Sequence, residues 1–177
     1  AYNTWPSDEE LITKYLDILA ARGSSRPFMS FITTVTSHQP YSTSSEYGDK
    51  YMHLFPDEYS RELKRYMSKL KVVDNALGLL LEGLENMELL EDTVIVLFAD
   101  HYPYAIDIDT LNHALDYDAS VDNLADATPL IIYSSELEKK EITQYTSYID
   151  ILPTIANLFN LKYDSRLYMG RDVLSLE

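Results

Sequence analysis

The chain has 177 residues, 46% of them hydrophobic, so it is long enough to form one domain with a sizeable core. Its 14 Lys and Arg against 29 Asp and Glu give a formal charge of -15, which opposes general electrostatic binding to nucleic acid or anionic lipid. The absence of Cys excludes disulfides, thiolate metal sites and a Cys nucleophile. No apolar run approaches the roughly 20 residues that cross a bilayer. Because of the negative charge, a phosphate-bearing substrate would need a cation to bind here.

The first third of the chain predicts a helix, a strand and a loop. Ser7 precedes acidic residues, and apolar residues then recur at helical spacing, which predicts a helix over about 8–21. The mostly apolar segment 28–35 predicts a buried strand that ends shortly before His38. Residues 41–57 are rich in Ser, Tyr, Gly and Pro and predict a loop.

A long amphipathic helix comes next. Apolar residues from Tyr59 to Leu84 keep the three-and-four spacing of one helical face. Asp74 lies among them, and we expect it to pair with a neighbour on the helix surface. Basic residues cluster on the early turns, where we expect a solvated face rather than a phosphate patch: Arg61, Lys64, Arg65, Lys69 and Lys71.

The most informative segment is the apolar run 93–99, which stops abruptly at Asp100-His101. A β-branched run this apolar predicts a strand buried on both faces, and ligands of open α/β sheets bind where such strands end. Adjacent carboxylate and imidazole groups suit Zn²⁺ or Mn²⁺, although two ligands do not complete a metal site. The alternative is that Asp100 caps the following turn beside an incidental His101.

The rest of the chain predicts one more strand and one more helix. Residues 105–126 carry many Asp but break the EF-hand spacing, so we expect a solvated acidic excursion. Segment 128–133 predicts a short strand, and a helix is expected over about 148–159. Strands separated by helices predict an α/β fold with a largely parallel sheet flanked by helices, in a single domain over residues 1–177.

Six motifs in this order carry a family resemblance. They are Ser37-His38-Gln39-Pro40-Tyr41, Val73-Asp74, Ala99-Asp100-His101, and segments 127–132, 145–154 and 169–172. Together they resemble the C-terminal part of the sulfatase-like catalytic domain of lipoteichoic acid synthases and related phosphoglycerol transferases, in the alkaline phosphatase superfamily. The resemblance covers nearly the whole chain and implies an alkaline phosphatase/sulfatase-like fold, with this chain as a single partial domain.

The resemblance also implies residue roles. Asp100 and His101 would bind a divalent metal, Mn²⁺ first and Mg²⁺ or Zn²⁺ as alternatives, and His38 would contact the phosphoglycerol head group. His38 alternatively caps the Pro40 turn. Ala99 stands where the family usually has Gly, which affects the backbone beside the metal site. No segment before Pro27 resembles the family's threonine nucleophile, so we expect no catalytic nucleophile in this chain and no activity from the chain alone.

The implied activity is transfer of phosphoglycerol from a phospholipid donor to a glycolipid or polymer acceptor. The implied parent protein is anchored in the bacterial cell membrane, with this part extracytoplasmic. A sulfatase or a phosphoethanolamine transferase, which would share the same metal half-site, remains an alternative, as does a non-catalytic fragment or interaction domain. Such a fragment would expose apolar surface and could self-associate.

Four further residues have less specific expectations. We expect Asp150 and Thr154 to cap and stabilise the last helix. His53 and His113 match no motif and are expected at the surface or in packing.

Overall fold

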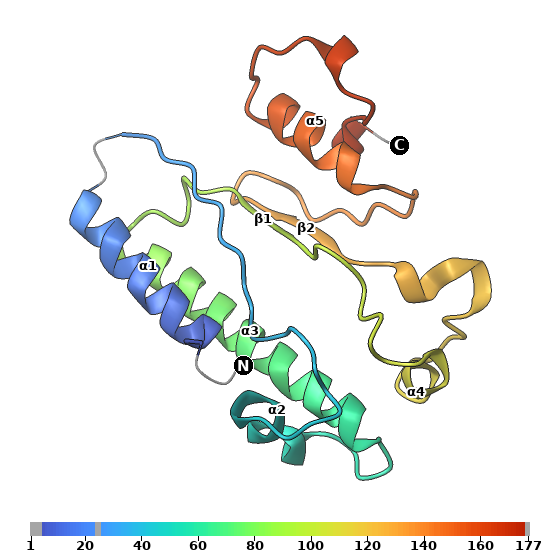
Figure 1. Cartoon of the computed structure of the whole chain (residues 1–177). Coiled ribbons are helices and arrows are strands. Elements are labelled where there is room, and N and C mark those ends of the chain that lie inside the picture. Colours follow the sequence, from blue (N-terminus) through green and yellow to red (C-terminus); the bar gives the residue numbers. More distant parts are fainter. Residues whose placement is uncertain (1–4, 24–25, 176–177) are drawn as a thin grey trace. The chain divides into compact units, whose positions relative to one another are not determined.

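The computed structural model describes residues 5–23 and 26–175 (Figure 1). The chain divides into two compact units, Ala1–Glu136 and Leu137–Glu177, which are described separately below. The expectation of a single domain stays a prediction. Among the described helices, none is both long and apolar enough to cross a membrane.

Helix α1 (Asp8–Arg22) matches the helix predicted over 8–21, and a capping box explains where it begins. The Ser7 hydroxyl accepts the Glu10 N–H at 3.1 Å, while the Glu10 carboxylate accepts the Ser7 N–H at 3.3 Å. The helix ends at Gly23, whose φ of 74° is a conformation that favours glycine.

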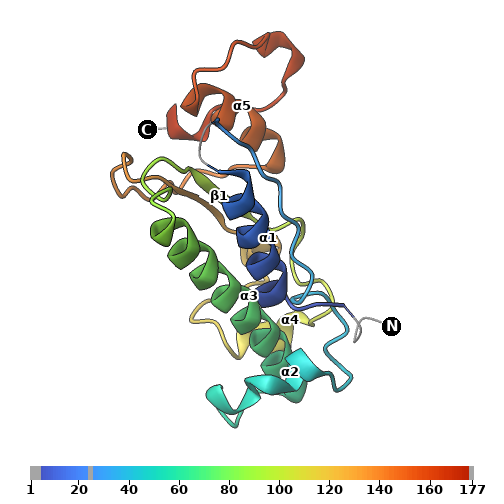
Figure 2. The ribbon, with the colours of Figure 1, turned by 90° about the vertical axis from the view of Figure 1, so that its left-hand side faces the viewer.

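Helix α3 (Arg61–Asn86) is the long amphipathic helix that the sequence predicts, and Ser60 caps its first turn. Figures 1 and 2 both show α1 lying alongside α3. Gly83 makes the close approach possible, because a Cβ at this position would come within 2.5 Å of the Leu16 side chain. Buried Leu63, Val72 and Leu84 form the inner face of α3.

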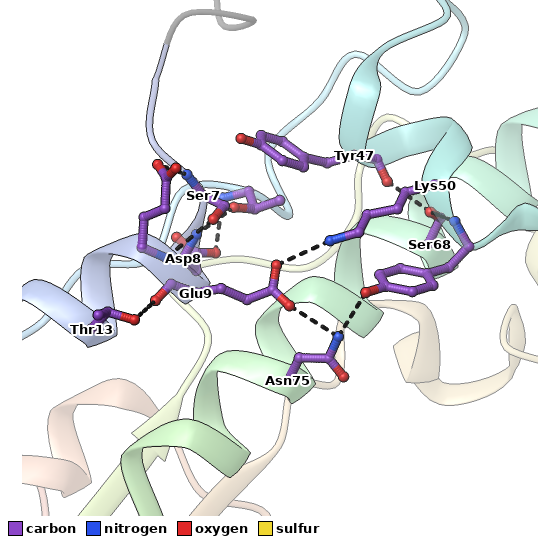
Figure 3. Close-up of polar contacts among 11 residues, drawn as sticks. Ser7, Asp8, Glu9, Thr13, Tyr47, Lys50, Ser68 and Asn75 are labelled. Atoms are coloured by element: carbon purple, nitrogen blue, oxygen red, sulfur yellow. Dashed lines mark hydrogen bonds and ion pairs between the residues drawn. The ribbon is translucent and has the colours of Figure 1, made fainter. Parts of the chain in front are cut away.

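The segment expected to be a loop contains short helices. These are α2 (Glu46–Lys50), capped by Ser45, and a 3₁₀ turn over Met52–Leu54. Figure 3 shows how polar groups hold this region against α1 and α3: Glu9 binds Lys50 and Asn75, each at 3.2 Å. The prediction missed these helices because each is too short to show apolar periodicity.

The sheet of the first unit has two strands, β1 (Ile95–Phe98) and β2 (Leu130–Tyr133). Both lie where the sequence predicts strands, but they pair antiparallel, with Ile95 opposite Tyr133. The predicted parallel pairing is wrong for this pair. The connection holds α4 (Ile108–Asn112) and a 3₁₀ segment, Val121–Asp126, and a connection of this length permits either strand direction, so the sequence did not indicate which one forms. Strand β1 is half-buried throughout rather than buried on both faces.

The strand predicted over 28–35 is wrong. This segment is extended but forms no ladder with any described residue, and Met29 and Phe31 are 87% and 75% exposed. Phe31 lies near β1, with its ring centroid 6.4 Å from that of Phe98. Strand propensity was present, but a strand also needs a partner for its backbone hydrogen bonds.

The second unit is built around α5 (Tyr148–Leu158). Asp150 accepts the Ser147 N–H and the Arg171 N–H, each at 2.8 Å, and the Thr154 hydroxyl accepts the Val173 N–H at 3.0 Å. These contacts confirm the expectation that Asp150 and Thr154 cap and stabilise the last helix. They also bind the closing loop to it.

Candidate functional site

His38 lies in a tight turn that follows the extended segment. Its N–H donates to the Val35 carbonyl at 3.0 Å, and the Gln39-Pro40 peptide bond is cis. The His38 ring is half-buried, and its Nδ1 lies 2.8 Å from the Gln39 carbonyl oxygen. Because a carbonyl oxygen only accepts, Nδ1 carries the proton in the neutral ring and Nε2 carries the lone pair.

Asp100 and His101 follow β1 after Ala99 and lie at the surface, with side chains 83% and 43% exposed. His101 Nδ1 lies 2.8 Å from the Tyr102 carbonyl oxygen, so this nitrogen carries the proton in the neutral ring. His101 Nε2, which then has the lone pair, is 3.6 Å from Asp100 Oδ1. A backbone carbonyl on Nδ1 is a usual way to orient a metal-binding imidazole.

The structure brings the two predicted site segments together. The Gln39 side-chain amide donates to the Tyr104 hydroxyl at 3.2 Å. The Tyr104 ring in turn packs against the His101 ring, with 4.9 Å between centroids. The His38 turn and the Asp100-His101 loop, far apart in sequence, therefore meet through one glutamine and one tyrosine.

The Asp100-His101 pair fits a borderline divalent metal in donor type, with one carboxylate oxygen and one imidazole nitrogen on the same side of the loop. Across residues 5–23 and 26–175, no third His, Cys, Asp or Glu joins them in a cluster that could hold a metal ion. The described residues thus offer two ligands of the three or four that a protein metal site uses.

Asp8 binds the backbone just before the His38 turn, a contact that the sequence did not indicate. This 1% exposed carboxylate accepts the N–H of Val35 at 2.9 Å and of Thr36 at 3.0 Å. The Asp8 N–H donates back to the Thr36 hydroxyl at 3.0 Å. The first turn of α1 therefore holds the backbone two residues before His38.

Lys69 was also missed, because the sequence assigned it to a solvated basic face. It is only 6% exposed, and its ammonium donates to the His38 carbonyl at 2.6 Å and to the Pro40 carbonyl at 3.3 Å. Burial lowers the pKa of Lys69. The helical spacing could have predicted this burial, because Lys69 is three residues after Tyr66 and four before Val73, on the apolar side of the helix. Lys64 is 9% exposed, so the expectation of a solvated side chain is wrong for this residue as well.

A small core lies under the turn. Tyr41 is buried with Leu63 and Ile106, and its hydroxyl donates to the Ser37 carbonyl at 2.9 Å. Burial, reinforced by Tyr66 and Tyr104, strongly raises the pKa of Tyr41.

Three other acids or imidazoles lie apart from this site. Asp74 pairs with Lys71 at 2.5 Å on the surface of α3, as expected. His53 and His113 are exposed, also as expected.

The chain is similar to lipoteichoic acid synthases and to a sulfatase. The lipoteichoic acid synthase of Staphylococcus saprophyticus is 25% identical over 95% of this chain and 26% of its own length. An ulvan-active sulfatase from Formosa agariphila is 27% identical over 77% of this chain and 29% of its own. The crystal structure of the lipoteichoic acid synthase LtaP from Listeria monocytogenes superposes with a TM-score of 0.77 and 28% identity, covering 96% of this chain and 43% of that one.

These findings confirm the resemblance to lipoteichoic acid synthases and the alkaline phosphatase/sulfatase-like α/β fold class. The chain spans about a quarter of the length of these curated relatives. The sulfatase family matches residues 1–161. Because this match takes in most of the sequence, the chain belongs to the sulfatase family.

Proposed function

We propose that this chain supplies part of the metal site and the head-group contact of a phosphoglycerol transferase of the lipoteichoic acid synthase type. The parent protein, anchored in the bacterial cell membrane, would move phosphoglycerol from a phospholipid to a glycolipid or polymer acceptor on the extracytoplasmic side. The observation that carries the proposal is the Gln39–Tyr104–His101 contact, which joins the His38 turn to the Asp100-His101 loop. The similarity to two lipoteichoic acid synthases supports the choice of reaction.

We assign each residue a role that its geometry supports. Asp100 and His101 Nε2 would hold a divalent ion, Mn²⁺ first and Mg²⁺ or Zn²⁺ as alternatives, which would supply Lewis acidity toward a phosphoryl oxygen. His38, with Nδ1 held on a backbone carbonyl, would accept a hydrogen bond from a glycerol hydroxyl of the head group through Nε2. In a chain of charge -15, cations are needed wherever a phosphate binds.

The transfer also needs a nucleophile, which the sequence leads us to expect outside this chain. In the proposed reaction a threonine hydroxyl loses its proton and its oxygen bonds to phosphorus, while the bond from phosphorus to the diacylglycerol oxygen breaks and the diacylglycerol oxygen takes up a proton. The oxygen of the acceptor hydroxyl then bonds to phosphorus and loses its proton, while the bond to threonine breaks and the threonine oxygen takes up a proton. The chain alone is therefore expected to be inactive.

Metal binding by the full chain tests the half-site. Mn²⁺ should raise the thermal unfolding midpoint only at high concentration, because two ligands bind weakly, and His101→Ala and Asp100→Asn should abolish the rise. Asp109→Asn, which alters an exposed acid, is the matched control. An equal rise in the His101→Ala variant would contradict the assignment, and saturation at submicromolar Mn²⁺ would show a more complete site than proposed.

Activity of the parent protein tests the reaction. His101→Ala should abolish phosphoglycerol release from phosphatidylglycerol, and turnover near the unmodified level would contradict the proposal. Phosphatidylethanolamine as a second donor separates a phosphoethanolamine transferase from the proposed enzyme.

A sulfatase is the second candidate, because the Formosa agariphila relative is named as one. It would use the same metal half-site with a different nucleophile. Hydrolysis of an aryl sulfate by the parent protein, without release of phosphoglycerol, would favour this candidate.

A further inference from the structure

Lys69 is a buried cation whose ammonium binds the backbone of the His38 turn. Its Nζ donates to the carbonyl oxygens of His38 at 2.6 Å and Pro40 at 3.3 Å. The same nitrogen lies 5.5 Å from the ring centroid of Tyr41. In the described parts of the chain, no carboxylate forms an ion pair with it. The charge of Lys69 is thus balanced by carbonyl dipoles and a ring face.

Lys64, five residues earlier on the same helix, shows that burial does not require this arrangement. Its stem is buried to a similar degree, but its ammonium reaches outward to Asp57 at 3.0 Å, and the Asp57 side chain is fully exposed. A long stem usually lets a lysine head reach water or an acid in this way. Lys69 instead keeps its charge inside, at a cost in desolvation that its two hydrogen bonds offset.

Besides the Asp8 and Tyr41 contacts described above, a small cavity lies beside the turn. His38 and Lys69 line a cavity of about 30 Å³ together with Trp5 and Tyr47, a space that accommodates about one water molecule. Packing alone therefore does not fix the turn on this side. Two carbonyl oxygens held by one ammonium fix the backbone on both sides of Gln39, and through it the direction of the His38 ring.

We propose that Lys69 is a positioning residue for His38: by binding the carbonyls of residues 38 and 40, its ammonium holds the turn that presents the imidazole to the site. The use of that imidazole for a phosphate head group rests on the proposed function. The positioning itself does not, since it concerns only contacts within the chain.

The imidazole signals of ¹⁵N-labelled full chain test the positioning directly. Lys69→Met keeps the stem and removes the charge and its donors, so the His38 ring signals should shift while those of His53 and His113 stay in place. Lys64→Met is the matched control and should leave all of these signals unchanged. Lys69→Arg, which retains charge and donors, should restore the His38 signals toward their original positions.

Unchanged His38 signals in Lys69→Met would overturn the proposal. If circular dichroism shows that this variant does not fold, the same spectra are recorded for Lys69→Gln, whose shorter amide cannot reach both carbonyls; unchanged signals there overturn it equally.

Titration with glycerol phosphate and Mg²⁺ separates this inference from the proposed function. In the unmodified chain the ligand should shift His38, and Lys69→Met should weaken the apparent affinity about tenfold, the loss expected from one misplaced hydrogen bond. A ligand that leaves His38 of the unmodified chain unshifted contradicts the proposed function, while the ligand-free spectra still decide the role of Lys69.

Discussion

Asp8 shows how one buried carboxylate can fix a segment that has no strand partner. Both of its oxygens accept backbone N–H groups, from Val35 and Thr36, and its own N–H binds the Thr36 hydroxyl. The segment before His38 therefore has its hydrogen bonds to a helix N-terminus rather than to a sheet. This contact, rather than strand pairing, sets where the His38 turn begins.

Asp8→Ala should lower the free energy of unfolding by about 3 kcal/mol, because it leaves two buried N–H groups without an acceptor. Urea denaturation followed by circular dichroism measures the change. Asp17→Ala, at an exposed position of the same helix, should change it by less than about 0.5 kcal/mol. Equal effects of the two substitutions would mean that the Asp8 contacts contribute nothing to stability.

Gly170 lies so close to the backbone of α5 that it has no room for a side chain. Pro153 has no N–H, so the Ile149 carbonyl lacks its usual helical donor, and the backbone of Gly170 packs directly against that carbonyl. A Cβ at residue 170 would overlap the Ile149 carbonyl group. Only glycine fits this approach.

Gly170→Ala should therefore destabilise the second unit by about 1–3 kcal/mol, the usual cost of forced overlap. Gly78→Ala is the matched control: no atom lies within 4 Å of the added methyl group, so it should stabilise α3 by about 0.5–1 kcal/mol. Thermal unfolding of both variants measures the difference. Gly170→Ala as stable as the unmodified chain would refute the overlap.

At the scale of elements, α3 and the turn it supports contribute two tyrosines that pack together, a half-buried Tyr66 and a buried Tyr41. Burial raises the pKa of Tyr66, and it raises the pKa of Tyr41 further. Both hydroxyls then keep their protons in the folded state at a pH where the unfolded chain has released them. A raised pKa in the folded state stabilises the fold below the unfolded pKa, and this stabilisation is lost as pH rises. Lys69 acts in the opposite sense, because burial lowers its pKa.

The free energy of unfolding should therefore fall as pH rises through about 10, with Lys69 offsetting part of the decline. Tyr66→Phe removes one of these two phenols and should make the decline shallower. Urea unfolding at about pH 8 and about pH 11 measures it. Tyr145→Phe, at a side chain that is 79% exposed, should leave the decline unchanged. An identical decline in the two variants would show that Tyr66 does not contribute.

The elements also show what could be predicted from the sequence. Helices α1, α3 and α5 were predicted because each carries its own apolar period and caps, which need no distant partner. Strands β1 and β2 were located, but their antiparallel pairing depends on how the connection between them folds. Segment 28–35 has the composition of a strand but forms no ladder with any described residue, so the strand predicted from its local sequence is wrong.

The residues of the candidate site were likewise predicted only in part. His38, Asp100 and His101 were found because each follows an apolar segment in a familiar motif order, and the structure brings their loops together. Their ligand roles stay predictions. Lys69 was missed because a lysine in a basic run has no local sign of its partners, which are carbonyls 29 and 31 residues away in the chain.

At the scale of the whole molecule, the second of the two units begins with an exposed, mostly polar segment. Residues 137–141 are all exposed and lie outside helices and strands, and they include Lys139 and Lys140. Exposed, irregular backbone is the preferred substrate of proteases, whereas helical backbone must first unfold.

Limited trypsin digestion should therefore cut first after Lys139 or Lys140, and mass spectrometry of the early products identifies the site. Lys64 and Lys69 in α3 serve as internal controls, since they are buried and helical and should be cut late. Early cuts within α3 would contradict the division into these two units.

Helix α3 holds the neighbouring loop in a way that bears on how this sequence can vary. Lys69 binds the carbonyls of residues 38 and 40, and Arg65 binds those of 41 and 42. Ser68 binds the carbonyl of 47 and the N–H of 51 (Figure 3). All of these partners are main-chain groups, which every residue type except proline offers in full. Loop residues whose side chains make no contacts of their own can therefore be exchanged at little cost, whereas inserting or deleting one residue would move the main-chain groups out of reach of α3.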